Sequence, residues 1–442
     1  MKKVLILAYD FPPYVSVGGL RPYNWYKYLK EFDVEPVVIT RQWGNVHGNQ
    51  LDYISAGESE KCIIEETEFG TIIRTPYKPN LANRLMLKYG EKKYRILRKS
   101  ISAFYEFAQF IVPTGPKVEL YRGAKEYLKN NKVDVIIATG DPFVLFSFAS
   151  KLSKEFDIPW IADYRDPWSQ GIEIQKKVLL KYWSRLFEKK ITKTASLICT
   201  ANDFFKKHIE SLIKAQNIIV IANGYSEYSI NSSKSTNQKK DVLTIAFAGT
   251  IYKWHPIKRF IQSCEEFLTH HENRKLDLVF YGINNQPEIE DFLQENYPQR
   301  KINIVFHEKI SNEVLGVKMA QHNVFLLFND YSIIGTKVYT YLGLKRKILL
   351  CFSHDQKANK LKEQFFRIQK NESNCEAYQA DLINETNSGI IVKDAAHLKE
   401  VLKELYLEFE EKGFIACDSV GVENYSRKIQ VEKLAELIKE MK

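Results

Sequence analysis

The sequence lacks the features that most readily mark a membrane protein, a metal site or a dinucleotide site. None of its apolar runs approaches the roughly 18 residues of a membrane-spanning helix. Its six cysteines are scattered without CxxC spacing, which argues against a zinc site or a disulfide framework and for reduced thiols in the cytosol. The segment VSVGGLRP, after the first apolar run, does not supply GxGxxG. No DxD motif lies on a suitable loop, so we expect neither a bound metal nor a resident cofactor.

The composition is that of a soluble globular protein with two or three domains. The chain has 442 residues, of which 45% are apolar and 27% are charged. The N-terminal sequence MKKVLILAYDFPP begins like a signal peptide, but Asp10 and two prolines end its apolar run after about seven residues. We therefore interpret it as a first β-strand and expect a cytoplasmic protein.

A net charge of +10 favours an anionic partner, and part of the excess lies in one segment, residues 84–110. Its basic residues, opposed between 84 and 99 only by Glu91, are Arg84, Lys88, Lys92, Lys93, Arg95, Arg98 and Lys99. A basic helix with interleaved aromatic and aliphatic residues can lie on an anionic membrane, here peripherally at the inner face of the plasma membrane. The alternative is a solvated helix face above a core stripe. No nucleic-acid partner is expected, because no DNA- or RNA-binding motif accompanies the basic residues.

Short apolar runs alternate with longer amphipathic segments along the chain. The runs are rich in Val, Ile and Leu without clean alternation, as is typical of strands buried on both faces. The predicted strands are 3–9, 36–40, 71–75, 133–139, 158–163, 196–200, 218–222, 242–248, 275–281, 302–306, 323–328, 348–352 and 389–393. The alternation predicts an α/β protein with doubly wound parallel sheets.

The polar segment 223–241 has little to bury and is predicted to link two domains, residues 1–222 and 242–424. Residues 425–442 carry an apolar stripe behind a Ser426 N-cap, so this helix is predicted to return to the first domain. Both domains begin alike. KVLILAY leads to Gly18 and Gly19, and VLTIAFAGT ends in Gly249 and Thr250. Because a strand ending in glycine brings N–H groups close to a bound anion, we expect two Rossmann-like domains facing a central cleft.

Six motifs then follow one another in a recognisable order. They are YDFPPYVSVGGLRPYNWYKYL, IPWIADYRDPWS, FEKKITKTASLICTAND, VIANGYS, IAFAGTIY and GTKVYTYLGLKRKILL. Together they resemble the GT-B glycosyltransferases, in particular the retaining family 4 and its bacterial surface-polysaccharide members. The resemblance implies a nucleotide-sugar donor in the C-terminal domain. It also implies an acceptor in the N-terminal domain, either a saccharide or a polyprenyl-diphosphate-linked saccharide.

The resemblance also implies a donor site. In GTKVYTYLGL, Lys337 matches the family's Lys-x-x-x-Tyr-Leu helix and is expected to meet the donor phosphate at a helix start. The other donor-binding candidates are Gly18, Gly19, Gly249, Thr250, Lys253, Lys258, Gly335 and Thr336, with Arg259 as a further cation. Many members carry two Glu residues eight positions apart, where this chain has Ser332 and Thr340. Thr340 is the candidate for a ribose hydroxyl, which it binds more weakly than a carboxylate.

The catalytic candidates Asp163, Arg165 and Asp166 lie at the C-terminal end of a predicted strand, where open α/β sheets place ligand groups. Either Asp163 or Asp166 is expected to orient or deprotonate the acceptor hydroxyl, and the alternative is an Asp–Arg pair that only fixes the loop. Weaker candidates are Arg21, Asp141, Glu188, His307, Tyr339 and Tyr341. Salt bridges are the alternative for Glu188, packing for the two tyrosines, and a structural or exposed position for His307.

The resemblance implies a retaining glycosyltransferase, and the absence of a metal motif fits metal-independent transfer. The missing Glu pair leaves open a catalytically silent binding or scaffold subunit with the same fold. A GT-B-like nucleotide-sugar epimerase or an NAD-type enzyme is the other alternative, and the absent dinucleotide fingerprint opposes the NAD-type enzyme.

Overall fold

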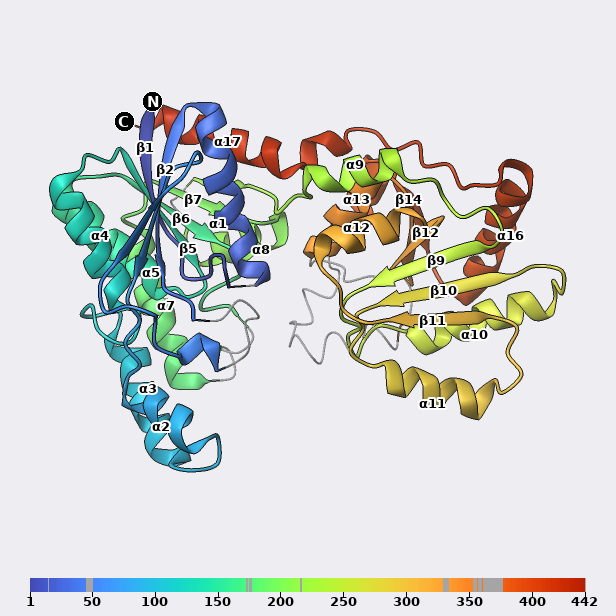
Figure 1. Cartoon of the computed structure of the whole chain (residues 1–442), viewed down its shortest axis with the longest axis horizontal. Coiled ribbons are helices and arrows are strands. Elements are labelled where there is room, and N and C mark those ends of the chain that lie inside the picture. The colour runs from blue at the N-terminus through green and yellow to red at the C-terminus, as the bar shows by residue number, and fades with distance from the viewer. Residues whose placement is uncertain are drawn as a thin grey trace. The chain divides into compact units, whose positions relative to one another are not determined.

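The chain divides into two compact units, which Figure 1 shows in a computed structural model. The structure describes residues 1–14, 16–44, 51–171, 174, 177–214, 217–328, 334–352, 356, 360 and 377–441. Unit 1 comprises Met1–Ala222 and Lys428–Lys442, and unit 2 comprises Asn223–Arg427. Unit 1 is therefore assembled from two separate pieces of sequence.

Unit 1 is built on an eight-stranded sheet in the order β3-β4-β2-β1-β5-β6-β7-β8. The strands are β1 (Lys2–Leu7), β2 (Val34–Arg41), β3 (Ile63–Glu66), β4 (Thr71–Thr75), β5 (Val135–Gly140), β6 (Trp160–Tyr164), β7 (Leu197–Thr200) and β8 (Ile218–Val220). All neighbours pair in parallel except β3, which runs antiparallel to β4 at the edge of the sheet.

Helices cover both faces of this sheet. They are α1 (Val17–Tyr28), α2 (Leu81–Tyr89), α3 (Arg95–Ala108), α4 (Val118–Asn130), α5 (Val144–Phe156), α7 (Val178–Thr192), α8 (Asp203–Leu212) and α17 (Arg427–Glu440). Alternate residues of β1 enter two separate cores. Leu5 joins the core beneath α4, α5, α7 and α8, whereas Ile6 joins the core beneath α1 and α17. This is why the strands read as continuous apolar runs.

Helix α17 completes the second of these cores. Its Val431, Leu434, Ala435 and Ile438 are buried there with the strand residues. Its Gln430 accepts a hydrogen bond of 2.7 Å from the backbone N–H of Ala222, just after β8. The last helix is thus part of the first unit's core.

Unit 2 has a six-stranded, fully parallel sheet in the order β11-β10-β9-β12-β13-β14. The strands are β9 (Leu243–Ala248), β10 (Leu276–Tyr281), β11 (Asn303–His307), β12 (Val324–Phe328), β13 (Lys347–Cys351) and β14 (Gly389–Val392). The helices are α9 (Glu227–Ser235), α10 (Ile257–Thr269), α11 (Gln286–Asn296), α12 (Asn312–Ala320), α13 (Thr336–Leu344), α15 (Tyr378–Glu385) and α16 (Ala395–Lys412).

The predicted α/β class with two parallel-sheet domains is confirmed, and each predicted strand overlaps an observed one. Two features differ from the sequence-based expectation. Strand β3 was not predicted, because an edge strand buries few side chains and reads as polar. Residues 223–241, predicted as a linker, contain α9, which packs against α12 and α13 within unit 2. In the part of the chain that the structure describes, no helix is both long and apolar enough to cross a bilayer.

The packing of α17 predicts that its apolar face stabilises unit 1. Leu434 is only 1% exposed, so Leu434→Ala is expected to lower the free energy of unfolding by about 2–5 kcal/mol. Urea denaturation followed by circular dichroism measures this. Glu436→Ala, on the exposed side of the same helix, is the matched control and is expected to change stability by less than about 0.5 kcal/mol. Equal effects of the two variants would contradict the assignment.

Candidate functional site

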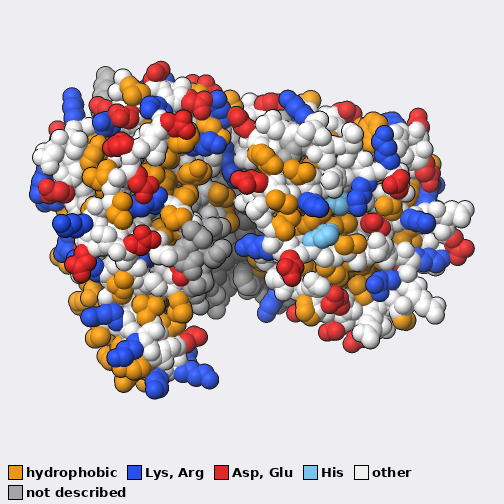
Figure 2. Space-filling view, in the orientation of Figure 1, with side chains coloured by type: hydrophobic (Ala, Val, Ile, Leu, Met, Phe, Trp, Pro, Cys, Tyr) orange, Lys and Arg blue, Asp and Glu red, His pale blue; other side chains and the backbone are white. Residues whose placement is uncertain are grey.

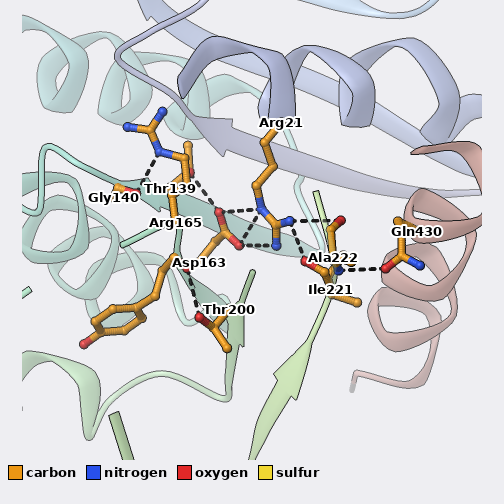
Figure 3. Close-up of polar contacts among 10 residues, drawn as sticks. Arg21, Thr139, Gly140, Asp163, Arg165, Thr200, Ile221, Ala222 and Gln430 are labelled. Atoms are coloured by element: carbon orange, nitrogen blue, oxygen red, sulfur yellow. Dashed lines mark hydrogen bonds and ion pairs between the residues drawn. The ribbon is translucent and has the colours of Figure 1, made fainter. Parts of the chain in front are cut away.

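A buried ion pair holds the carboxyl end of the unit 1 sheet together (Figure 3). Arg21 of α1 donates from Nε and Nη2 to the Asp163 carboxylate of β6 at 2.7–3.1 Å, and both side chains are almost fully buried. The Thr139 hydroxyl at the end of β5 donates to the same carboxylate at 2.8 Å. Arg21 Nη1 also donates to the carbonyls of Ile221 and Ala222, after β8. The guanidinium and the carboxylate thus find their hydrogen-bond partners within the protein.

Asp163 therefore does not have the surroundings of a carboxylate that touches an acceptor. It is 0% exposed, and both of its oxygens accept from Arg21 or Thr139. Of the two interpretations of the Asp163–Asp166 segment, the geometry favours a positioning role for Asp163. Its partner is Arg21, which lies far away in the sequence, and not the nearby Arg165.

Arg165 points away from Asp163 and contacts the end of β5 (Figure 3). Its Nε donates to the Gly140 carbonyl at 2.9 Å, and its Nη2 donates to the Asp141 carbonyl. Its Nη1 lies 3.9 Å from Asp10 Oδ2, at the end of β1. Arg165 thus brings a cation to the carboxyl ends of three neighbouring strands.

Asp10 is a charged residue at this edge that the sequence reasoning did not single out. Ser16 Oγ donates to its Oδ2 at 3.0 Å, whereas its Oδ1 is buried without a hydrogen-bond partner among the described residues. Burial raises the pKa of Asp10, and the Arg165 cation opposes the shift. A buried oxygen with a vacant lone pair at a sheet edge is suited to accept a hydrogen bond from a ligand. Its position directly after the first strand was the available signal.

Three further charges, those of Asp166, Asp141 and Lys117, complete this edge. Loss of hydration raises the pKa of Asp166, with Arg165 lowering it and Asp141 raising it. Lys117, at the start of α4, is half-buried, and loss of hydration lowers the pKa of its ammonium while Asp141 opposes the shift. We call Asp10, Lys117, Asp141, Arg165 and Asp166 the edge cluster.

The glycines at the start of α1 make room for this cluster. A Cβ on Gly18 would lie 1.8 Å from Arg165 Nη1 and 2.8 Å from Asp10 Oδ2. Gly19 lies against the Asp10 backbone, and its N–H donates to Ser16 Oγ, the N-cap of α1. The donor contact predicted for Gly18 and Gly19 stays a prediction, but their local role is to admit Asp10 and Arg165.

Glu188 of α7 supports the loop that carries Asp166. Its Oε2 accepts from the backbone N–H of Ser169 at 3.0 Å, and its Oε1 accepts from the Tyr164 hydroxyl at 3.1 Å. The residue is fully buried, so the surface salt bridges considered for it from the sequence are wrong.

Unit 2 brings together donor candidates from two distant segments. Lys337, in the first turn of α13, reaches the turn after β9, where its Nζ lies 3.4 Å from the Thr250 carbonyl and 3.7 Å from the Phe247 ring centroid. Gly249 has φ +88°, a conformation that favours glycine, and a Cβ there would lie 3.7 Å from Lys337 Cε. Gly335 is the N-cap of α13 and has no side chain with which to cap the helix. The Lys337 ammonium therefore lies close to the N–H groups of the first turn of α13, which begins at Thr336.

The other predicted donor residues lie in different surroundings. Lys258 is on α10, with its Nζ 5.4 Å from the Phe292 ring of α11, and Lys253 and Arg259 are exposed. The Thr340 hydroxyl donates within its own helix to the Thr336 carbonyl at 3.3 Å. Ser332 lies outside the described residues.

Three aromatic candidates lie in packed or stacked positions. The Tyr341 hydroxyl accepts from the Ala248 N–H at 3.1 Å inside the core, and the Tyr339 ring packs 5.9 Å from that of Tyr425. His307 stacks on Tyr281 at the end of β10, with the ring centroids 4.7 Å apart. Among the residues that the structure describes, no three His, Cys, Asp or Glu side chains gather as a metal site would require.

A scan against models of protein families finds no match, and a search of curated protein sequences finds no relative. Solved structures do match along the whole chain. A sucrose-phosphate synthase from Thermosynechococcus elongatus is 14% identical, with 100% of this chain and 99% of that chain covered and a TM-score of 0.56. A glycosyltransferase from Rickettsia africae is also 14% identical, with coverages of 100% and 98% and a TM-score of 0.57. HepE from Anabaena, solved with UDP and glucose, is 10% identical, with both chains covered completely and a TM-score of 0.53. The chain therefore has the GT-B fold.

The buried Glu188 predicts a pH-dependent stability. Burial raises its pKa from 4.5 to about 7, against the hydrogen bonds from Ser169 and Tyr164. The folded protein therefore holds a proton that the unfolded chain releases near pH 4.5, and stability falls as the pH rises from there to about 7.

Glu188→Gln keeps the shape and cannot ionise, so its stability should lack this part of the pH dependence. Relative to their difference at pH 4, the variant is expected to gain about 3 kcal/mol over the wild type at pH 8. Urea unfolding at a series of pH values measures both profiles. Parallel profiles would show that Glu188 ionises in the folded protein as it does in the unfolded chain.

Proposed function

We propose that the protein is a glycosyltransferase that moves a sugar from a nucleotide-sugar donor to a saccharide or lipid-linked saccharide acceptor. The observation that carries this proposal is the convergence of Lys337 with Gly249 and Thr250 at the N-terminus of α13. The GT-B fold supports it, and so does the relative from Anabaena, which was solved with UDP and glucose. The motif order further favours a relation to retaining family 4 and a role in bacterial surface-polysaccharide biosynthesis.

The donor diphosphate would lie at the start of α13. A helix N-terminus offers unpaired N–H groups and the positive end of the helix dipole, and the Gly249 turn lets backbone approach closely. Lys337 now rests on the Phe247 ring and the Thr250 carbonyl, and a bound phosphate would be a stronger partner for its ammonium than either.

Sugar transfer builds negative charge on the leaving diphosphate. The proposed reaction is metal-independent, because the ammonium of Lys337 and the N–H groups of the α13 start would stabilise that charge. Retention of configuration would follow if a donor phosphate oxygen accepts the proton of the acceptor hydroxyl on the face from which the leaving group departs.

The acceptor would meet the edge cluster of unit 1. Asp166 is the carboxylate that we propose to orient the acceptor hydroxyl, because it is exposed where Asp163 is buried and bonded to Arg21 and Thr139. Arg165 and Lys117 carry positive charge to the same edge and would suit an acceptor that bears a diphosphate, such as a polyprenyl-diphosphate-linked saccharide. We propose a cytoplasmic protein that works peripherally at the inner face of the plasma membrane.

Loss of the Lys337 ammonium is expected to weaken nucleotide binding. A charge-assisted hydrogen bond contributes about 1.5–3 kcal/mol, so Lys337→Ala should weaken UDP binding by about 10- to 150-fold in calorimetry. Lys275→Ala, which removes an exposed cation just before β10, is the control and should bind like the wild type. Where UDP gives no signal, GDP and CMP replace it. Unchanged affinity of Lys337→Ala for the nucleotide that binds would refute the phosphate role.

Loss of the Asp166 carboxylate is expected to separate transfer from donor binding. Asp166→Asn should lower turnover by about 100-fold or more while nucleotide affinity is unchanged. The assay is run with EDTA, so that wild-type turnover also tests metal independence. If wild-type protein binds a nucleotide sugar but never transfers it to any acceptor, the protein is the catalytically silent subunit. Normal turnover of Asp166→Asn would exclude the carboxylate from the reaction.

A further inference from the structure

Helices α2 and α3 form a hairpin that buries almost nothing of its own. None of the 14 residues of α3 is buried, and α2 buries only Ala82. In Figure 1 the hairpin extends beyond the sheet of unit 1 and the helices that cover it. A helix of a globular protein normally buries an apolar stripe. The core stripe considered for residues 84–110 is therefore absent from α3, and its apolar residues need another explanation.

Large apolar side chains of this hairpin face solvent. Ile96 is 84% exposed and Phe104 is 64% exposed. Also exposed on the hairpin are Leu81, Leu87, Tyr89, Tyr94 and Leu97. Figure 2 shows hydrophobic and basic side chains side by side over α2 and α3. Single exposed apolar residues are ordinary, but a contiguous group of this size marks an interaction site.

Helix α7 adds a second apolar face. Val178, Leu179, Tyr182 and Leu186 are 66%, 79%, 65% and 58% exposed and recur at helical spacing. Its opposite face holds Phe187 and other residues in the core of unit 1. The helix is therefore apolar on both sides, and its outer face is unpartnered among the described residues.

The hairpin and α7 are in direct contact. Trp183 Nε1 of α7 donates to the Phe107 carbonyl of α3 at 3.1 Å. A groove of about 760 Å³ lies between the hairpin and α7, and its lining includes the apolar Ala103, Phe107 and Leu179 and the basic Arg95 and Lys99. The exposed faces of α2, α3 and α7 thus make one surface, which we call the basic–apolar surface.

The charge of this surface selects the partner. Residues 81–108 contain seven Lys and Arg against two Glu, a net charge of +5. A second copy of the chain would present the same positive charge and be repelled. Basic side chains interleaved with exposed Leu, Ile, Phe and Tyr match a bilayer, whose anionic headgroups take the cations and whose acyl region takes the apolar side chains.

We propose that the basic–apolar surface docks the protein on an anionic lipid bilayer, with the hairpin and the first two turns of α7 entering the headgroup region. The basic residues set the dependence on anionic lipid and on salt. The apolar residues of both α3 and α7 penetrate and hold the protein at high salt, where charges are screened. Docking is tested without any sugar substrate, so a failure of docking and a failure of the proposed sugar transfer can be told apart.

Co-sedimentation of the full chain with vesicles tests the proposal. Wild type is expected to bind vesicles of phosphatidylcholine with phosphatidylglycerol, and to bind phosphatidylcholine alone at least about tenfold more weakly. The charge variant is Lys92→Glu, Arg95→Glu and Lys99→Glu, and it should bind the anionic vesicles about a hundredfold more weakly. Arg98 is left intact, because it donates to the Lys93 and Glu91 carbonyls within the hairpin.

The apolar variant is Ile96→Ser, Phe104→Ser and Leu179→Ser. It should keep its preference for anionic lipid but lose the binding that wild type retains at 0.5 M salt, where the Debye length is only about 4 Å, against about 10 Å at 0.1 M. The charge control is Lys275→Glu, Lys318→Glu and Lys403→Glu in unit 2. The apolar control is Leu407→Ser, Phe414→Ser and Val420→Ser, which are 54%, 43% and 58% exposed in wild type. Both controls should bind like wild type.

Three results would overturn the proposal. Wild type could stay in the supernatant with anionic vesicles, or the controls could lose binding as much as the variants do. Alternatively, sedimentation equilibrium could show that wild type is an oligomer which the apolar variant dissociates, and the surface would then be a subunit interface. Because every substituted side chain is exposed, the thermal melting of each variant should match that of wild type, and this separates lost docking from lost folding.

Discussion

The arrangement of unit 1 depends on the buried pair between Arg21 and Asp163. An isolated charge at this depth would cost several kcal/mol, so each group is tolerated only because the other is present with its hydrogen bonds complete. The pair fixes α1 against β6, and the carbonyls after β8 are bound by the same guanidinium. Residues 165 and 166 follow β6 directly, so the edge cluster takes its position from a contact that lies beneath it.

A division of labour between two arginines follows from this. Arg21 donates hydrogen bonds to buried groups inside unit 1, whereas Arg165 lies at the strand ends and reaches Asp10. Gly18 lies against Arg165, which means that the conformation of the α1 start and that of the guanidinium are set together. In unit 2, Lys337 is likewise brought to a glycine turn from a helix start. Both units therefore place a cation and a glycine at the carboxyl ends of their strands, although the two cations come from unrelated positions in the sequence.

The sequence predicted the strands well, because strands of parallel sheets are buried on both faces and read as unbroken apolar runs. It predicted less where a residue's role depends on distant partners. Asp163 and Arg165 are only two positions apart in sequence, yet each is paired with a residue of another segment, which spacing cannot reveal. Asp10 was overlooked because a single carboxylate after a strand has no pattern. The periodicity of α7 does not reveal which of its sides meets the core, since both of its faces carry apolar residues.

The return of α17 has a consequence for how the chain is made. Val431, Leu434 and Ile438 leave the ribosome only after all of unit 2, yet they belong to the core of unit 1. Until they arrive, the apolar residues of unit 1 that share this core lack their cover and are open to water. A chaperone that binds exposed apolar surface would bind here. A nonsense codon late in the gene would remove α17 and so destabilise unit 1, the part of the protein that was translated first.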